Sequence, residues 1–259
     1  MIIIGRSGCG KTKLLYKLLL ENYFNLDRIV FVSPSLDQIE YDVIIKSLQK
    51  VLSIKQIRTI FEQQKHITDI NNSLDIISNN EKFKPNNLEV TVYEKPDDIP
   101  LPRELNPKGY KRILVIIDDC TFINSVKPIQ LFVYGRPLNI NTIYLSQKYT
   151  KVPCTIRENC NEFVFFEQNT RTINDFIFRE VCDQFEKNIE IESFCKMNIK
   201  AKHDFILYNK DEGKWYDRTL NPITLSKLNS PNLKSINSGM GYKLYPDQES
   251  YLNAKAKTY

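Results

Sequence analysis

The fold of this chain is decided by a short stretch near its start, Ile2-Ile3-Ile4-Gly5-Arg6-Ser7-Gly8-Cys9-Gly10-Lys11-Thr12. The three isoleucines form an apolar, β-branched run, which indicates a buried strand. Gly5–Thr12 is a complete Walker A motif, whose glycines let the backbone curl so that successive N–H groups face a phosphate. Leucines at helical spacing follow in Lys11–Tyr23, so a strand leads into the motif and a helix leads out of it. The stretch therefore predicts a phosphate loop that binds a nucleoside triphosphate at a helix N-terminus.

The motif also assigns roles to single side chains. We expect the Lys11 ammonium to reach the β- and γ-phosphates and count it among the catalytic residues, and we expect the Thr12 hydroxyl to be a ligand of Mg²⁺. A chance glycine-rich turn is the alternative, and the correct flanks on both sides argue against it. The predicted set of ATP-binding residues consists of Gly5, Arg6, Ser7, Gly8, Cys9, Gly10, Lys11 and Thr12.

A second apolar run, Ile113–Ile117, is followed by Asp118 and Asp119 and fits a Walker B segment. We expect Asp118 to hold Mg²⁺, directly or through a water molecule, and Asp119 to polarise the attacking water as the general base. The alternative for both carboxylates is that they only open a turn after a strand. Hydrolytic motors usually have Glu at the second position, so Asp119 requires the water to lie slightly closer.

Two further features are typical of hydrolytic P-loop proteins. The strand Asn141–Leu145 is followed by Ser146 and Gln147, where a γ-phosphate sensor would lie, because strand ends face the ligand crevice in open α/β sheets. Arg136 lies in the turn before that strand and could reach the nucleotide of a neighbouring subunit, and Arg157 is a second candidate for this role. The alternatives are a strand-end cap for Gln147 and a solvated surface charge for either arginine.

The rest of the chain alternates between strand-length apolar runs and amphipathic stretches, which indicates an α/β fold built from βαβ units. We expect further strands at residues 29–32, 88–93 and 163–166, a hairpin at residues 202–208 and 214–217, and helices at residues 36–79, 125–134 and 171–187. Residues 94–109, which contain four prolines, and residues 152–159 are predicted to be loop or irregular. The domain is expected to cover residues 1–220, and residues 221–259 to form a polar C-terminal extension that is a docking arm or disordered.

Composition excludes several classes of protein. The chain has 259 residues, is 42% hydrophobic and carries a net charge of +5, so it is not collagen-like or wholly disordered, and a polyanionic partner is permitted. No apolar run approaches the ~20 residues of a spanning helix, and Met1–Ile4 is too short for a signal-peptide core. Six cysteines without a Cys-x-x-Cys pair, with only His66 and His203 to supplement them, predict reduced thiols without disulfides or structural zinc.

Taken together and in this order, the motifs resemble the FtsK/HerA superfamily of DNA-pumping P-loop ATPases, and more narrowly the genome-packaging ATPases of poxviruses and giant viruses. The stretch that narrows the choice is Gly135-Arg136 leading to Leu145-Ser146-Gln147 after an Asp-Asp Walker B. The resemblance implies a RecA-like domain of the ASCE type, with a mainly parallel central sheet flanked by helices. In it, Arg136 matches the arginine of the family's Gly-Arg motif and Gln147 its sensor glutamine, although Pro137 stands where a histidine is common.

The resemblance also implies partners and a location. It implies a homo-oligomeric ring that pumps double-stranded DNA into a preformed capsid, in contact with capsid or portal-vertex proteins. The protein would then work in the host-cell cytoplasm, at the viral factory, with the virion as a second location. Lys108–Arg112 and Lys148–Lys151 are candidate DNA contacts, and a solvated face is the alternative for both.

Other functions stay open at the level of sequence. A cellular or plasmid translocase of the HerA/FtsK type would share the same motifs. Asn209-Lys210-Asp211-Glu212 comes close to the base-reading motif of a GTPase but ends in Glu and lies in a predicted hairpin. A small-molecule kinase would need an Arg-rich lid, for which Arg171 and Arg179 are too sparse. A scaffold that does not hydrolyse ATP would not need the full set of catalytic residues.

Overall fold

The computed structural model describes residues 1–20, 26–35, 41, 44–45, 48, 88–120, 125–167, 181 and 194–223. The chain divides into two compact units, Met1–Ile223 and Thr224–Tyr259. The second unit lies outside the described residues, so the predicted extension at residues 221–259 stays a prediction. No helix in the described ranges is both long and apolar enough to cross a bilayer.

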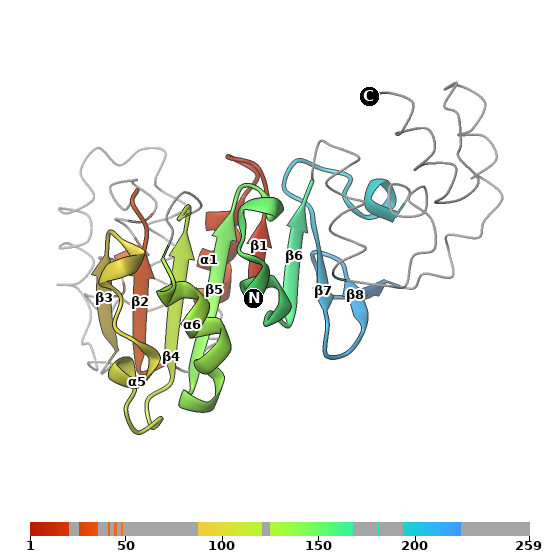
Figure 1. Ribbon diagram of the computed structural model, residues 1–259. Coiled ribbons are helices and arrows are strands. Elements are labelled where there is room, and N and C mark those ends of the chain that lie inside the picture. The colour runs from red at the N-terminus through yellow and green to blue at the C-terminus, as the bar shows by residue number, and fades with distance from the viewer. Residues whose placement is uncertain are drawn as a thin grey trace, which may run out of the picture. The chain divides into compact units, whose positions relative to one another are not determined.

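In the described residues, nine strands form one sheet in the order β3-β2-β4-β5-β1-β6-β7-β8-β9, which can be followed across Figure 1. Along the sheet from β3 through β2, β4, β5 and β1 to β6, neighbouring strands are parallel. Beyond β6, the strands β7, β8 and β9 extend the sheet by antiparallel pairing. Their bounds are β1 Ile2–Ile4, β2 Arg28–Val32, β3 Glu89–Tyr93, β4 Ile113–Asp118, β5 Ile140–Ser146, β6 Glu162–Phe166, β7 Phe205–Asn209, β8 Lys214–Tyr216 and β9 Pro222–Ile223.

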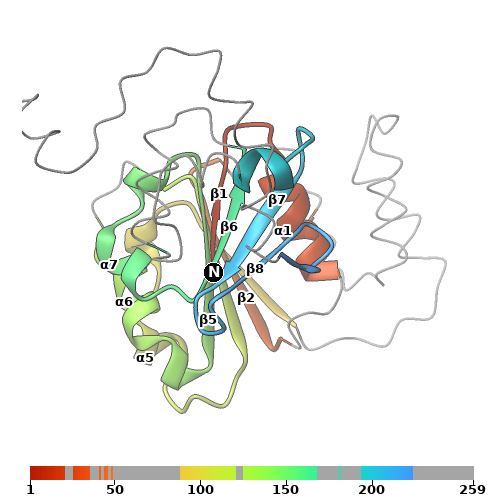
Figure 2. The same cartoon turned by 90° about the vertical axis from the view of Figure 1, so that its right-hand side faces the viewer.

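Helices cover both faces of the sheet. Figure 2 shows α1 on one face and α5, α6 and α7 on the other. The helices are α1 Lys11–Leu20, α5 Pro102–Leu105, α6 Lys127–Tyr134 and α7 Cys154–Glu158, with 3₁₀ turns η2 Pro96–Asp98, η3 Arg136–Leu138 and η4 Tyr149–Lys151. Because β1 and β4 are covered on both sides, Ile2–Ile4 and Ile113–Ile117 are apolar and at most 1% exposed.

The parallel pairing fixes which chain segments share an edge of the sheet. Ile4 of β1 pairs with Ser146 of β5, and Asp118 of β4 pairs with Leu145. The carboxyl ends of β1, β4 and β5 therefore meet at one edge, and their amino ends meet at the opposite edge. Strand β5 lies between β1 and β4.

The predicted strands and the hairpin across residues 209–213 are confirmed. The prediction that residues 94–109 and 152–159 are loop or irregular was wrong in part, since these segments contain α5 and α7. Pro102 is the first residue of α5, a position whose N–H has no partner within the helix, so proline is tolerated there. The Glu104 carboxylate accepts a hydrogen bond from the Leu101 N–H at 2.8 Å. The predicted helices at residues 36–79 and 171–187 lie almost wholly outside the described residues.

Candidate nucleotide-binding and hydrolysis site

The phosphate loop joins β1 to α1 and is held by the neighbouring strand. The Gly5 N–H donates to the Ser146 carbonyl at 3.1 Å, and the Leu14 N–H donates to Gly10 at 2.9 Å as the helix begins. Gly8 and Gly10 have φ of +71° and +112°, a backbone region that side chains disfavour. At Gly5 a Cβ would collide with Cys9 Sγ and lie 2.8 Å from Phe166 Cβ. Glycine is therefore required by space at Gly5 and by backbone conformation at Gly8 and Gly10.

Lys11 is folded back onto the loop that precedes it. Its Nζ donates to the carbonyl of Gly5 at 2.6 Å and to that of Arg6 at 3.0 Å. Those two oxygens hold the ammonium at the mouth of the loop, where a phosphate would meet it. Arg6 forms an exposed ion pair with Glu167 at 3.5 Å, beyond the end of β6.

Asp118 ends β4 on the face of the sheet that α1 covers. Its Oδ2 accepts a hydrogen bond from the hydroxyl of Tyr41 at 2.5 Å, and the Thr12 side chain lies near the same phenol. Burial raises the pKa of Asp118 above its ordinary value, and the hydrogen bond from Tyr41 and the charge of Lys11 offset part of this increase. Burial and the nearby Asp118 charge also raise the pKa of Tyr41, so its phenol keeps its proton.

The oxygens of Thr12 and Asp118 fit Mg²⁺ by their chemistry. A hydroxyl and a carboxylate are hard oxygen donors, and Mg²⁺ in nucleotide sites takes one or two protein ligands and completes its shell with phosphate and water. Asp118 accepts a hydrogen bond from Tyr41, and the Thr12 side chain is near enough to influence the pKa of the same phenol, so the two predicted ligands lie in one region.

Asp119 and Gln147 are also brought together. The Gln147 amide Nε2 lies 3.2 Å from each carboxylate oxygen of Asp119, across the ends of β4 and β5. Asp119 has φ of +53°, a left-handed conformation that turns the chain away at the end of the strand. The predicted base and the predicted sensor are thus direct partners next to the phosphate loop.

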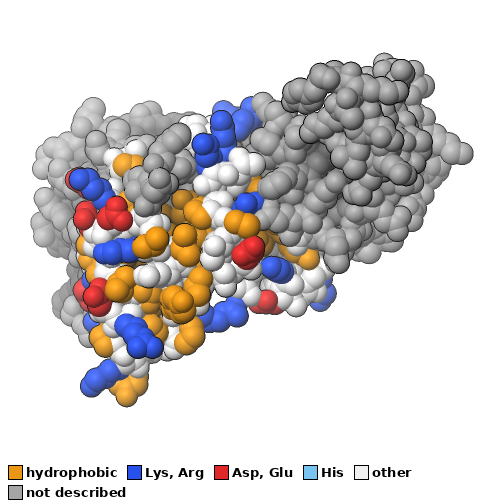
Figure 3. Space-filling model, in the orientation of Figure 1, with side chains coloured by type: hydrophobic (Ala, Val, Ile, Leu, Met, Phe, Trp, Pro, Cys, Tyr) orange, Lys and Arg blue, Asp and Glu red, His pale blue; other side chains and the backbone are white. Residues whose placement is uncertain are grey.

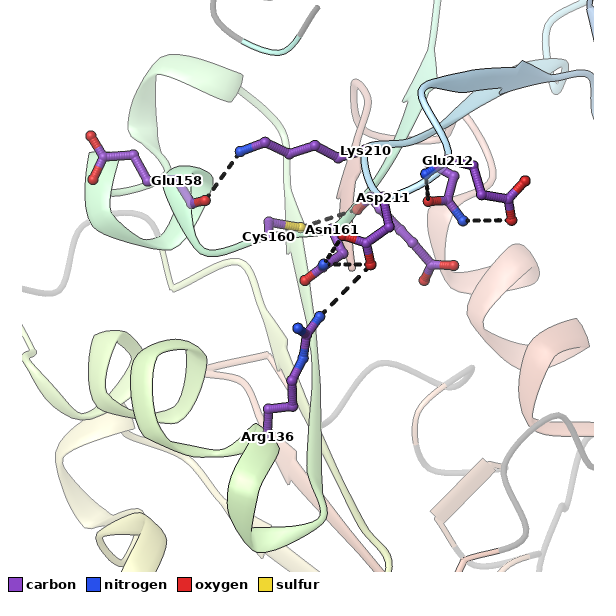
Figure 4. A network of polar contacts seen from close by, with 9 residues as sticks. Arg136, Glu158, Cys160, Asn161, Lys210, Asp211 and Glu212 are labelled. Carbon is purple, nitrogen blue, oxygen red and sulfur yellow. Dashed lines mark hydrogen bonds and ion pairs between the residues drawn. The ribbon is translucent and has the colours of Figure 1, made fainter.

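Arg136 lies at the opposite edge of the sheet from the phosphate loop. Its Nη2 is 3.9 Å from Asp211 Oδ2 in the β7–β8 hairpin, and both side chains are mostly exposed (Figure 4). The Asn161 amide donates to both Asp211 oxygens, at 2.5 and 2.6 Å. These residues line a cavity of about 240 Å³. Arg136 therefore does not reach the nucleotide site of its own chain.

Three of the other basic candidates, Arg157, Lys111 and Arg112, have structural contacts. The Arg157 guanidinium lies 4.8 Å from the centroid of the Tyr149 ring, a cation–π contact. Lys111 pairs with Glu89 at 3.2 Å and Arg112 with Asp27 at 3.4 Å. On the face seen in Figure 3, hydrophobic side chains gather over α6, and Lys and Arg side chains lie both among them and around the margin.

Two residues at the site were not predicted. Tyr41 follows no motif, and only the packed structure brings it to Asp118, 77 positions away. From the sequence, His203 is considered only where structural zinc is excluded; in the structure its Nδ1 lies 2.9 Å from the carbonyl oxygen of Cys9, inside the phosphate loop. It comes from the turn before β7, which no sequence signal ties to the loop.

A parallel sheet with the phosphate-loop strand β1 separated by β5 from the acidic strand β4, and with Asp119 and Gln147 beside the loop, defines a P-loop ATPase. Residues 1–211 match the family described as Poxvirus A32 protein. The chain belongs to this family, as the motifs predicted.

Solved structures show the same fold. One is the genome packaging NTPase B204 from Sulfolobus turreted icosahedral virus 2 in complex with ATP-gammaS, with a TM-score of 0.53 and 12% identity over 86% of this chain and 97% of that one. Another is B204, the DNA-packaging ATPase from Sulfolobus Turreted Icosahedral Virus, with a TM-score of 0.51 and 14% identity over 86% and 97% of the two chains. The predicted α/β P-loop fold is confirmed. A comparison with curated protein sequences gives no match.

Proposed function

We propose that this protein is the ATP-hydrolysing motor that packages double-stranded viral DNA into a preformed capsid. Membership of the poxvirus A32 family supports the viral packaging class over a cellular translocase or a kinase. The observation that best supports hydrolysis as the activity is the pairing of Asp119 with Gln147 at 3.2 Å beside the phosphate loop. A base joined to a polar sensor is what water activation needs, whereas a kinase directs its phosphate to another acceptor.

Binding of ATP follows from the loop itself. The N–H groups of Gly5–Thr12 would hold the phosphates, and Lys11 would exchange the carbonyls of Gly5 and Arg6 for phosphate oxygens. Thr12 and Asp118 would hold Mg²⁺, which when bound neutralises charge that builds up on the phosphates.

Asp119 would orient the attacking water and take its proton. Its carboxylate accepts hydrogen bonds from the Gln147 amide. A γ-phosphate that accepts the Gln147 N–H would release the carboxylate for the water. The pair would thus link the arrival of ATP to the availability of the base, and the loss of phosphate to its withdrawal.

Arg136 would act on the nucleotide of an adjacent subunit in a homo-oligomeric ring. Its location at the opposite edge of the sheet from its own phosphate loop supports a role in trans rather than in cis. The exposed ion pair with Asp211 contributes only about 0–1 kcal/mol, so leaving it costs little. An arginine supplied in trans typically raises the rate ~10³–10⁵-fold. Arg157 is the second candidate for this role.

The proposed partners are double-stranded DNA and capsid or portal-vertex proteins, and the proposed place of work is the viral factory, with the virion as a second location. DNA would be held through phosphate contacts, so its affinity should fall with salt and show little sequence preference. B204 has the same fold and is a genome packaging NTPase, which supports this direction.

Steady-state ATP hydrolysis, measured against protein concentration with and without linear double-stranded DNA, tests the proposal. We expect turnover per chain to rise steeply with concentration and to increase further with DNA. Arg136→Ala should keep nucleotide affinity and lose this rise. Turnover per chain that is constant with concentration and indifferent to DNA would instead indicate a self-contained phosphotransferase.

A further inference from the structure

Tyr41 occupies a position that the predicted reaction does not explain. Its side chain is 1% exposed, and its hydroxyl donates to Asp118 Oδ2 at 2.5 Å. Asp118 is one of the two residues that we expect to hold Mg²⁺. The phenol therefore holds a predicted metal ligand from the side of the hydrophobic core.

The ring of Tyr41 is fixed by packing. It meets the ring of Phe31 edge-on, with centroids 6.3 Å apart and planes at 76°, and it belongs to the core cluster that includes Ile44 and Ile116. Phe31 pairs with Ile116 across β2 and β4, so the strand that ends in Asp118 also supports the ring. The hydroxyl is therefore held in register with the carboxylate rather than moving freely.

A carboxylate that binds a metal through one oxygen needs its other oxygen to be restrained. Groups that hydrogen-bond metal ligands fix the orientation of those ligands, and removing such a group typically lowers metal affinity by about 10- to 100-fold. Tyr41 has the properties of such a group: a short hydrogen bond to one carboxylate oxygen, burial that excludes competing water, and a packed ring.

We propose that Tyr41 is a positioning residue for Mg²⁺, which holds Asp118 through Oδ2 and leaves Oδ1 to the metal or to one of its waters. The inference rests on the proposed function only in requiring that the site binds nucleotide with Mg²⁺. It adds a residue from outside both Walker motifs to the metal site.

The test is a titration of Mg²⁺ into full-length protein with a fluorescent, non-hydrolysable ATP analogue, which reads binding and not turnover. For Tyr41→Phe we expect the Mg²⁺ midpoint to rise by about 10- to 100-fold, with the metal-free affinity for the analogue, measured in EDTA, unchanged. Tyr144→Phe is the matched control, because Tyr144 is also buried, at 3% exposed, but its hydroxyl faces the Cys120 carbonyl at 3.5 Å. Its midpoint should equal that of the wild type.

A wild-type midpoint in Tyr41→Phe overturns the inference, and a lower midpoint also overturns it, because the phenol would then compete with the metal. If Tyr41→Phe does not fold, Phe31→Leu loosens the ring but keeps the hydroxyl, and it should raise the midpoint several-fold; an unchanged midpoint overturns the inference. Absence of any Mg²⁺-dependent binding in the wild type would overturn the proposed function as well, which separates the two failures.

Discussion

Replacing Gly135 with alanine tests how the turn that carries Arg136 is built. Gly135 lies between α6 and η3 and caps both; its N–H donates to the Leu131 carbonyl at 2.9 Å, and its carbonyl accepts from the N–H groups of Leu138 at 2.9 Å and Ile140 at 3.0 Å. A Cβ here would collide with the Leu131 carbonyl and lie 3.1 Å from the Ile140 carbonyl oxygen. Both obstacles are backbone, so the turn itself must shift.

The magnitude follows from the bonds at risk. A shift that breaks one or two of these hydrogen bonds costs about 1 kcal/mol each, and the overpacking of a tight site costs about 1–3 kcal/mol. We therefore expect Gly135→Ala to lower the free energy of unfolding by about 1–3 kcal/mol. Because Gly135 lies at the sheet edge opposite to the phosphate loop, nucleotide affinity should be unchanged, while hydrolysis that depends on assembly should fall with the displacement of Arg136.

Urea unfolding measures the free energy, and a fluorescent ATP analogue measures the affinity. Tyr134→Ala is the control, since Tyr134 is 61% exposed and its loss should change stability by no more than about 0.5 kcal/mol. The reasoning is refuted if Gly135→Ala unfolds at the wild-type midpoint with the same urea dependence. A stable variant with weakened nucleotide binding would refute the assignment of the two sites to opposite edges.

Four further predictions concern the site and its support. Lys11→Ala should abolish binding of the ATP analogue, and retained wild-type affinity would remove Lys11 from phosphate binding. Asp119→Asn should bind ATP with near-normal affinity but lose turnover by ~10²-fold or more, and Gln147→Ala should lower turnover while leaving affinity in place; single-turnover kinetics distinguishes chemistry from binding. Burial raises the pKa of Asp204, but hydrogen bonds from Arg218 and two backbone N–H groups outweigh it, so the net pKa is lowered. A lowered pKa adds stability above about pH 4 that is lost as the pH falls, so the destabilisation caused by Asp204→Asn should shrink between pH 7 and pH 3 in urea unfolding.

Much of the fold could be predicted because its central strands are continuous apolar runs. β1 and β4 are nearly free of polar residues before their motifs, which is the signal of parallel strands covered on both faces. The order of the strands could not be derived in this way. The insertion of β5 between β1 and β4 depends on how the crossovers pack, and sequence periodicity carries no information about that.

Short helices and long-range contacts were the parts that sequence reasoning missed. The prolines before Gly109 read as breakers, although Pro102 starts α5 and the Glu104 side chain caps it. The partnership of Tyr41 with Asp118 depends on core packing between segments far apart in the chain. By contrast, the opposite locations of Arg136 and Gln147 follow directly from the parallel strand between them, one preceding it and the other following it.

Strand β5 also determines whether a movement at one end of the strand is passed on to its other end. β5 begins four residues after Arg136, ends one residue before Gln147, and is paired with β4 from Ile140 to Leu145 and with β1 over its last three residues. Its seven residues span roughly 20 Å, and sliding it would shear two hydrogen-bonded ladders at once. A pull on its carboxyl end is therefore transmitted to its amino end with little loss. In the proposed ring, the order in which subunits hydrolyse ATP would depend on the stiffness of β5, a strand to which we assign no contact with nucleotide or DNA.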